Sequence, residues 1–215
     1  MHDVDAGGRP VVTTAPITIV ALGDSTTAGT PGFRSPLESP PDGDGNVESQ
    51  YAYWLARAHR DWTVLNRGVN GERADQIFAR FDRDVRRARA EVVIVIAGVN
   101  DIYQGRGAEQ VVHALEAIYD AARDARIATV AGTIVPYNTA TPEANARMHE
   151  VNMWIRDVAA RRERLVFCDT RAAVAAPGAP DRLASSPDDL HPSPDGYRLM
   201  ADVLEPAVKL ALTKA

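Results

Sequence analysis

An apolar run near the start of the chain constrains the fold most strongly. Residues 16–22, Pro-Ile-Thr-Ile-Val-Ala-Leu, lack the alternation of apolar and polar residues that a half-exposed strand shows. Such runs are typical of a central strand in a parallel sheet, where other elements cover both faces. The run stops at Gly23-Asp24-Ser25. In open α/β sheets, reactive groups collect beyond the carboxyl ends of the strands, so Ser25 is the first candidate site residue.

Further strands and helices alternate along the rest of the chain. Strands are predicted at residues 62–69, 92–97, 128–135 and 165–168, the first of them less apolar, as at a sheet edge. Amphipathic helices are predicted between them, because apolar residues recur there at helical spacing. This alternation predicts an α/β fold, a three-layer α/β/α sandwich with a flavodoxin-like five-stranded parallel sheet. Residues 172–187, rich in alanine and proline, are predicted to be irregular.

Length and composition indicate one domain and a tail. With 215 residues, 45% of them hydrophobic, the chain can bury one substantial core. We therefore expect a single domain over residues 16–215 and a flexible tail over residues 1–15. Neither a signal peptide nor an apolar segment of membrane-spanning length is present in the sequence. We expect a cytoplasmic protein without membrane insertion.

Charge and cysteine content argue against several classes of function. The net charge of -5 does not favour nucleic acid, and the arginines at positions 83, 86, 87 and 89 alternate with acids, as on a solvated helix face. Because Cys168 is the only cysteine, a zinc cage would lack its thiolates, and because it closes an apolar run we expect a packed core thiol. Neither a Gly-x-Gly-x-x-Gly pattern nor a Walker-type lysine follows the first strand, which argues against nucleotide or flavin binding. We expect no metal, no cofactor and no nucleic-acid partner.

The longest irregular segment, residues 30–47, leaves the sheet next to Ser25. It contains four prolines and three glycines and shows no periodicity. The prolines make this loop stiffer than a glycine-serine linker, and its acidic residues outnumber its single arginine. We expect the loop to wall one side of a small pocket and to repel an anionic membrane surface.

Three other segments of the chain carry polar residues that are predicted to lie at the same edge of the sheet as Ser25. Asn70-Gly71 follows the second strand, Asn100 follows the third, and Asp188 and His191 precede the last helix. A serine hydroxyl is a poor nucleophile alone and requires a base. Histidine can accept and return a proton near neutral pH, and an aspartate can hold its tautomer. A glycine N–H and an asparagine amide can stabilise an oxyanion.

Taken in order, these segments resemble the four sequence blocks of the SGNH hydrolase superfamily, the GDSL-type esterases and lipases. The blocks correspond to 23–25 Gly-Asp-Ser, 68–71 Gly-Val-Asn-Gly, 98–101 Gly-Val-Asn-Asp and 188–192 Asp-Asp-Leu-His-Pro. The resemblance covers nearly the whole chain from Ile17 to the last helix.

The resemblance also implies a role for each of five residues. Ser25 would be the nucleophile, His191 the general base and Asp188 the acid that orients it. The oxyanion hole would consist of the N–H groups of Ser25 and Gly71 and the side-chain amide of Asn100. No metal takes part in this scheme.

Three neighbouring positions qualify this assignment. Asn70 stands where a serine often precedes the glycine in this family, which leaves a side-chain role there open but not the backbone role of Gly71. Gly68 is an alternative oxyanion donor, although its place near the strand end favours close packing. Asp24 is interpreted as a structural residue that holds the nucleophile turn by hydrogen bonds.

The resemblance implies a serine esterase that cleaves carboxylic esters through an acyl-enzyme. Combined with the small pocket expected beside residues 30–47, it favours short acyl groups on small soluble substrates, O-acetyl carbohydrates among them. One alternative is an acyl hydrolase of lysophospholipase or thioesterase type. Another is a catalytically silent module that binds acyl or glycan groups. The sequence does not indicate the oligomeric state.

Overall fold

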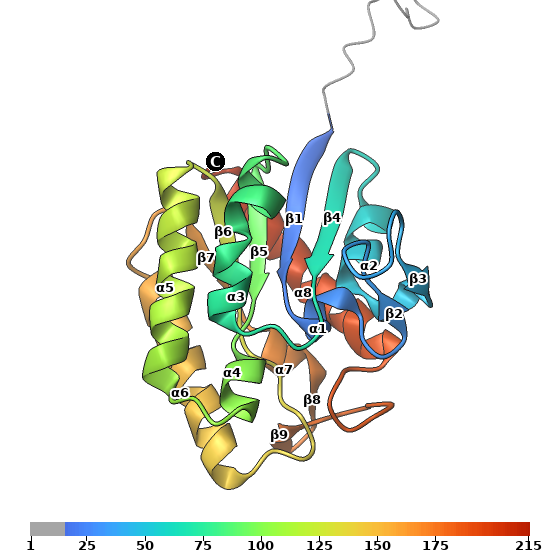
Figure 1. Cartoon of the computed structure of the whole chain (residues 1–215), viewed down its shortest axis with the longest axis vertical. Helices are drawn as coiled ribbons and strands as arrows, with labels where there is room; N and C mark the ends of the chain where they lie inside the picture. The colour runs from blue at the N-terminus through green and yellow to red at the C-terminus, as the bar shows by residue number, and fades with distance from the viewer. Residues whose placement is uncertain (1–15) are drawn as a thin grey trace, which may run out of the picture.

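Five parallel strands form the centre of the computed structural model, which describes residues 16–215 (Figure 1). The tail predicted for residues 1–15 lies outside the described residues. The strands lie in the order β4-β1-β5-β6-β7, which is the flavodoxin-like order and confirms the predicted α/β fold. Their bounds are β1 (Ile17–Gly23), β4 (Trp62–Gly68), β5 (Val92–Ile96), β6 (Ala128–Gly132) and β7 (Leu165–Cys168).

Strand register brings the segments of the predicted site to one edge of the sheet. Gly23, the last residue of β1, lies beside Gly68 in β4 and Ile96 in β5, each the last residue of its strand. Because the strands are parallel, the turns that follow them all leave from this carboxyl edge. The polar segments around Ser25, Asn70 and Asn100 therefore start from neighbouring points.

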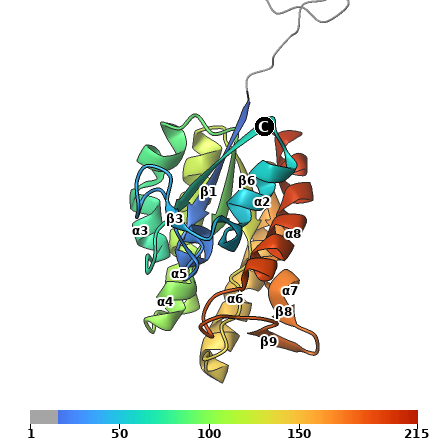
Figure 2. The same cartoon turned by 90° about the vertical axis from the view of Figure 1, so that its right-hand side faces the viewer.

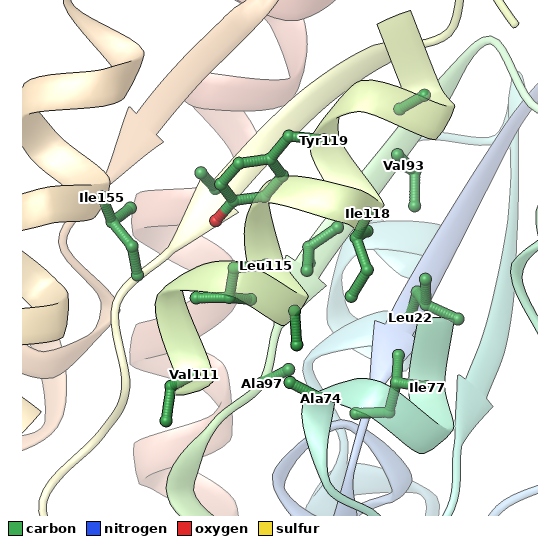
Figure 3. Close-up of a cluster of buried hydrophobic side chains, with 14 of the residues drawn as sticks. Leu22, Ala74, Ile77, Val93, Ala97, Val111, Leu115, Ile118, Tyr119 and Ile155 are labelled. Atoms are coloured by element: carbon green, nitrogen blue, oxygen red, sulfur yellow. The ribbon is translucent and has the colours of Figure 1, made fainter. Parts of the chain in front are cut away.

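Helices cover both faces of the sheet (Figure 2). One face packs against α3 (Ala74–Ala79), α5 (Ala108–Asp124) and α6 (Pro142–Ala159). The other face packs against α2 (Tyr51–Ala58) and α8 (Pro194–Leu212). Figure 3 shows the first of these clusters, in which Leu22 and Val93 of the sheet lie among Ile77, Leu115 and Ile118 of the helices. None of the helices in residues 16–215 combines the length and the apolar character needed to cross a membrane.

Short elements connect these layers. After β1 come α1 (Ser25–Ala28), β2 (Phe33–Arg34), β3 (Asp44–Gly45) and the 3-10 helix η1 (Val47–Ser49). The π-helical turn η2 (Asp82–Arg86) follows α3, and α4 (Val99–Tyr103) follows β5. After β7 come α7 (Thr170–Val174), β8 (Ala175–Ala176) and β9 (Ala179–Leu183).

Two of these segments differ from the sequence-based expectation. Within residues 30–47, β2 and β3 pair as a short antiparallel ladder rather than staying wholly irregular. Residues 172–187, predicted to be irregular, contain the end of α7 and the hairpin of β8 and β9. An ion pair ties the hairpin to α7, because Arg171 Nη2 lies 2.7 Å from Asp181 Oδ1 in β9. Such a contact leaves no periodic signal in the sequence.

Candidate active site

Ser25, His191 and Asp188 form a hydrogen-bonded chain at the carboxyl edge of the sheet. The Nε2 atom of His191 lies 2.9 Å from Ser25 Oγ, and its Nδ1 atom lies 2.7 Å from Asp188 Oδ2. Ser25 is 4% exposed and His191 is 9% exposed, so solvent has little access to the bond between them, whereas the Asp188 side chain is 29% exposed. In this arrangement the imidazole can take the proton of the serine hydroxyl while the carboxylate holds the ring in place.

The turn that presents Ser25 is held by the residue before it. Asp24 caps α1, because its Oδ1 atom accepts a hydrogen bond from the N–H of Thr26 at 3.0 Å. The backbone carbonyl of Asp24 also accepts the N–H groups of Thr27 and Ala28. Burial raises the pKa of Asp24 to about 7, although the hydrogen bond from Thr26 acts in the opposite direction. These contacts agree with the structural role predicted for Asp24.

Asp188 is arranged to accept hydrogen bonds from its own loop as well as from the histidine ring. Its Oδ1 atom accepts the N–H groups of Leu190 at 3.0 Å and His191 at 2.8 Å. Partial burial acts to raise the pKa of Asp188, but the hydrogen bonds from the His191 ring and these two N–H groups outweigh it and lower the pKa. The carboxylate is therefore charged at neutral pH and faces the imidazole.

Asp189 faces a different loop from Asp188. Its Oδ1 atom accepts a hydrogen bond from Asn138 Nδ2 at 2.9 Å, and its carbonyl accepts the Asn138 N–H at 2.7 Å. The backbone of Asp189 is in the left-handed region, with φ 62°, which turns the chain between the two side chains. Asn138, which the sequence did not single out, thus fixes the loop that carries His191.

Asn100 lies in α4, directly after β5, and its amide is oriented by the loop that carries Gly71. The Nδ2 atom of Asn100 donates to the backbone carbonyl of Glu72 at 2.9 Å. An amide group carries two N–H donors, so the second remains for a ligand. Within residues 16–215, the backbone N–H groups of Ser25 and Gly71 have no acceptor. These are the three donors that the family resemblance assigns to an oxyanion hole.

Glycine is required at positions 68 and 71, in the second sequence block, for two different structural reasons. Gly71 has φ 77° and open space at its Cβ position, so the left-handed backbone, rather than crowding, requires glycine there. At Gly68 a Cβ atom would lie 2.1 Å from the backbone nitrogen of Ala28, so close packing requires glycine. The Gly68 N–H already donates to Asn66 Oδ1 at 2.9 Å. Of the two, only Gly71 thus keeps its N–H available for the role that the family resemblance implies.

A small cavity opens in front of these groups. Its volume is about 150 Å³, and Asn70, Asn100, Ser25 and His191 contribute to its lining. The apolar part of the lining, which the sequence did not single out, consists of side chains from α4, the loop after β6 and the loop before α8: Val99, Tyr103, Tyr137 and Leu190. The rings of Tyr103 and Tyr137 meet edge to face, with centroids 5.8 Å apart.

The loop of residues 30–47 does not wall this cavity, contrary to the sequence-based expectation. All of its residues are described, and none of them lines the cavity. The loop packs against the turn after β4 instead, where Ser35 Oγ donates to the Gly68 carbonyl at 2.6 Å and the Asn70 N–H donates to Glu38 Oε1 at 3.0 Å. These contacts hold the Asn70-Gly71 turn from outside. The loop supports the site without limiting its volume.

Solved structures with this fold include several lipolytic proteins. A member of the lipolytic protein G-D-S-L family from Veillonella parvula is 18% identical, with a TM-score of 0.68 over 90% of this chain and 98% of that one. An acetylxylan esterase, Axe2 from Geobacillus stearothermophilus, is 18% identical, with a TM-score of 0.68 over 89% and 94%. A GDSL-like lipase from Bacteroides thetaiotaomicron is 18% identical, with a TM-score of 0.69 over 91% of each chain.

These similarities establish the fold, and a match at the level of sequence establishes the family. Comparison with curated proteins gave no match. The sequence model of the GDSL-like Lipase/Acylhydrolase family matches residues 21–199, a stretch that includes Ser25, Gly71, Asn100 and the loop of Asp188 and His191. The chain therefore belongs to the GDSL-like lipase/acylhydrolase family.

Proposed function

We propose that this acylhydrolase is a serine esterase that cleaves carboxylic esters through an acyl-enzyme. The observation that carries the proposal is the continuous hydrogen-bonded chain from Asp188 through His191 to Ser25, beside the N–H groups of Ser25 and Gly71, which have no acceptor among residues 16–215. The silent binding module is disfavoured by the same observation. A buried serine held 2.9 Å from a histidine that an aspartate orients is poised to act as a nucleophile.

The reaction follows from the positions of these atoms. As Ser25 Oγ attacks the ester carbonyl carbon, its proton passes to His191 Nε2 and the carbonyl oxygen becomes an oxyanion. The Ser25 N–H, the Gly71 N–H and the Asn100 amide stabilise that charge. His191 then gives the proton to the leaving alcohol, which departs and leaves an ester on Ser25. Water repeats the sequence, and the acid leaves as the serine is restored.

The cavity supports short acyl groups. Its volume of about 150 Å³ is roughly half of the smallest pockets, about 300 Å³, that accept drug-sized ligands. Tyr137 is 5% exposed and closes the cavity from within, whereas Tyr103 is 61% exposed and lies at its rim. The exposed ring of Tyr103 offers an apolar face to the alcohol part of the ester. One structural relative is described as an acetyl-xylooligosaccharide esterase, and we propose an O-acetyl carbohydrate as the substrate class here.

The acyl preference can be measured with p-nitrophenyl esters from acetate to decanoate. We expect kcat/KM to be highest between acetate and butyrate and to fall by roughly 10-fold or more at octanoate, because longer chains do not fit the cavity. Tyr103→Ala should shift the preference toward longer acyl groups. Phe78→Ala is a matched control, because Phe78 is 41% exposed and does not line this cavity. A wild-type preference for decanoate or lysophospholipids would instead favour the lysophospholipase alternative.

Asn100→Ala tests the oxyanion assignment. We expect kcat to fall by about 10²-fold to 10³-fold with little change in KM, because the amide stabilises a charge that exists only in the transition state. Steady-state kinetics with p-nitrophenyl acetate provide the measurement. If KM rises while kcat stays at the wild-type value, Asn100 binds the substrate and is not part of an oxyanion hole.

A further inference from the structure

One buried arginine contacts two strand ends and the loop that carry the proposed oxyanion donors. Arg80, at the end of α3, is 7% exposed. Its Nη2 atom donates to the carbonyl of Gly23 at 2.8 Å, at the end of β1. Its Nη1 atom donates to the carbonyl of Arg67 at 2.8 Å, near the end of β4. Its Nε atom donates to Glu72 Oε2 at 2.6 Å, in the turn between β4 and α3 (Figure 1).

Each of these contacts lies next to a donor group. Gly23 is two residues before Ser25, and Glu72 directly follows Gly71. The carbonyl of Glu72 is also the acceptor of the Asn100 amide, at 2.9 Å. A single guanidinium therefore connects the segment of the Ser25 N–H, the segment of the Gly71 N–H and the residue that orients the Asn100 amide.

We propose that Arg80 is a positioning residue that sets the spacing of the three oxyanion donors. The proposal rests on the proposed esterase function. Charge neutralisation alone does not explain the contacts, because Asp84 Oδ2 already pairs with Arg80 Nη1 at 2.8 Å. Arg80 reaches the two carbonyls, Glu72 and Asp84 with N–H groups on three different nitrogens, whereas the three N–H groups of a lysine ammonium sit on one atom and cannot reach all of these acceptors at once. Lysine at this position would keep the charge and lose the simultaneous contacts.

The test is a double-mutant cycle of Arg80→Lys and Asn100→Ala, with p-nitrophenyl acetate as the substrate. We expect Arg80→Lys to lower kcat by about 10-fold to 10²-fold with KM nearly unchanged, because a displacement of about 1 Å in a catalytic group can cost about 10²-fold. In the Asn100→Ala background the same change should cost at least about 3-fold less, since one of the positioned donors is already absent. A purely structural arginine would give the same factor in both backgrounds.

Arg171→Lys is the matched control. Arg171, in α7, is also buried, at 6% exposure, but it binds Asp181, Asn145 and the carbonyl of Ile134 and contacts none of the donor segments. We expect it to lower the melting temperature as Arg80→Lys does while leaving kcat near the wild-type value. If Arg80→Lys does not fold, Glu72→Ala replaces it in the cycle, because Glu72 is more exposed and its loss leaves Arg80 paired with Asp84.

The outcomes separate this proposal from the function on which it rests. Wild-type turnover that persists in Ser25→Ala would overturn the esterase mechanism and the role of Arg80 with it. If turnover depends on Ser25, two results would overturn the role of Arg80 alone. One is an unchanged kcat in folded Arg80→Lys. The other is an equal loss of kcat on Arg80→Lys in the wild-type and Asn100→Ala backgrounds. The role of Arg80 would be supported if Arg80→Lys lowers kcat more in the wild-type background than in the Asn100→Ala background and Arg171→Lys does not lower kcat.

Discussion

Ser25→Ala is expected to lower the turnover of p-nitrophenyl acetate by about 10⁶-fold while leaving the fold intact. In the proposed mechanism the hydroxyl forms the acyl-enzyme, and its loss leaves His191 without a proton to accept. Little rearrangement should follow, because Asp24 and the backbone bonds of α1 hold the turn without the Ser25 side chain.

The control is Ser39→Ala, in the loop of residues 30–47, which should retain wild-type turnover because Ser39 does not line the cavity. Circular dichroism and the melting temperature establish that both variants fold. Turnover near the wild-type value in folded Ser25→Ala would rule out this nucleophile.

Asp188→Asn should have the second largest effect, a loss of kcat of up to roughly 10⁴-fold. An asparagine in place of Asp188 can donate to His191 Nδ1 and so favour the tautomer that presents a proton, rather than a lone pair, to Ser25. The neighbouring change Asp189→Asn should cost far less, because the Asp189 side chain binds Asn138 and not the imidazole.

Kinetics of the two variants at neutral pH, with both melting temperatures measured, provide the comparison. A larger loss in Asp189→Asn, with both proteins folded, would show that the loop functions in another arrangement.

The strands and the polar segments at their carboxyl ends could be predicted because their signals are local, whereas the roles of Asp188 and His191 followed only from the family resemblance. Each strand is a short apolar run, and each polar segment follows the run that positions it, as Gly23-Asp24-Ser25 follows β1. The choice of Asp188 over Asp189 rests on its spacing from His191, which matches the family that the chain resembles. Side chains one residue apart in an extended loop tend to face opposite ways, and here the positive φ of Asp189 turns the chain as well.

The residues that support the site could not be predicted, because their roles depend on contacts between distant segments. Arg80 precedes the arginines at positions 83, 86 and 87, and only burial distinguishes it, since Arg83 and Arg86 are more than half exposed. Tyr103 lies in α4 and Tyr137 in the loop after β6, and the two rings meet only in three dimensions. The loop of residues 30–47 starts next to Ser25, yet Ser35 and Glu38 bind it to the turn after β4 and away from the cavity.

The most direct test of the mechanism is the mass of the protein after a rapid acid quench during turnover of p-nitrophenyl acetate. We expect a fraction of the wild-type protein to gain the mass of one acetyl group, and peptide mapping to place that group on Ser25. The Ser25→Ala protein should gain none. Two results would contradict the proposed acyl-enzyme. The protein could stay unmodified during turnover under conditions that trap ester intermediates, or the acetyl group that forms and disappears during turnover could lie on another residue.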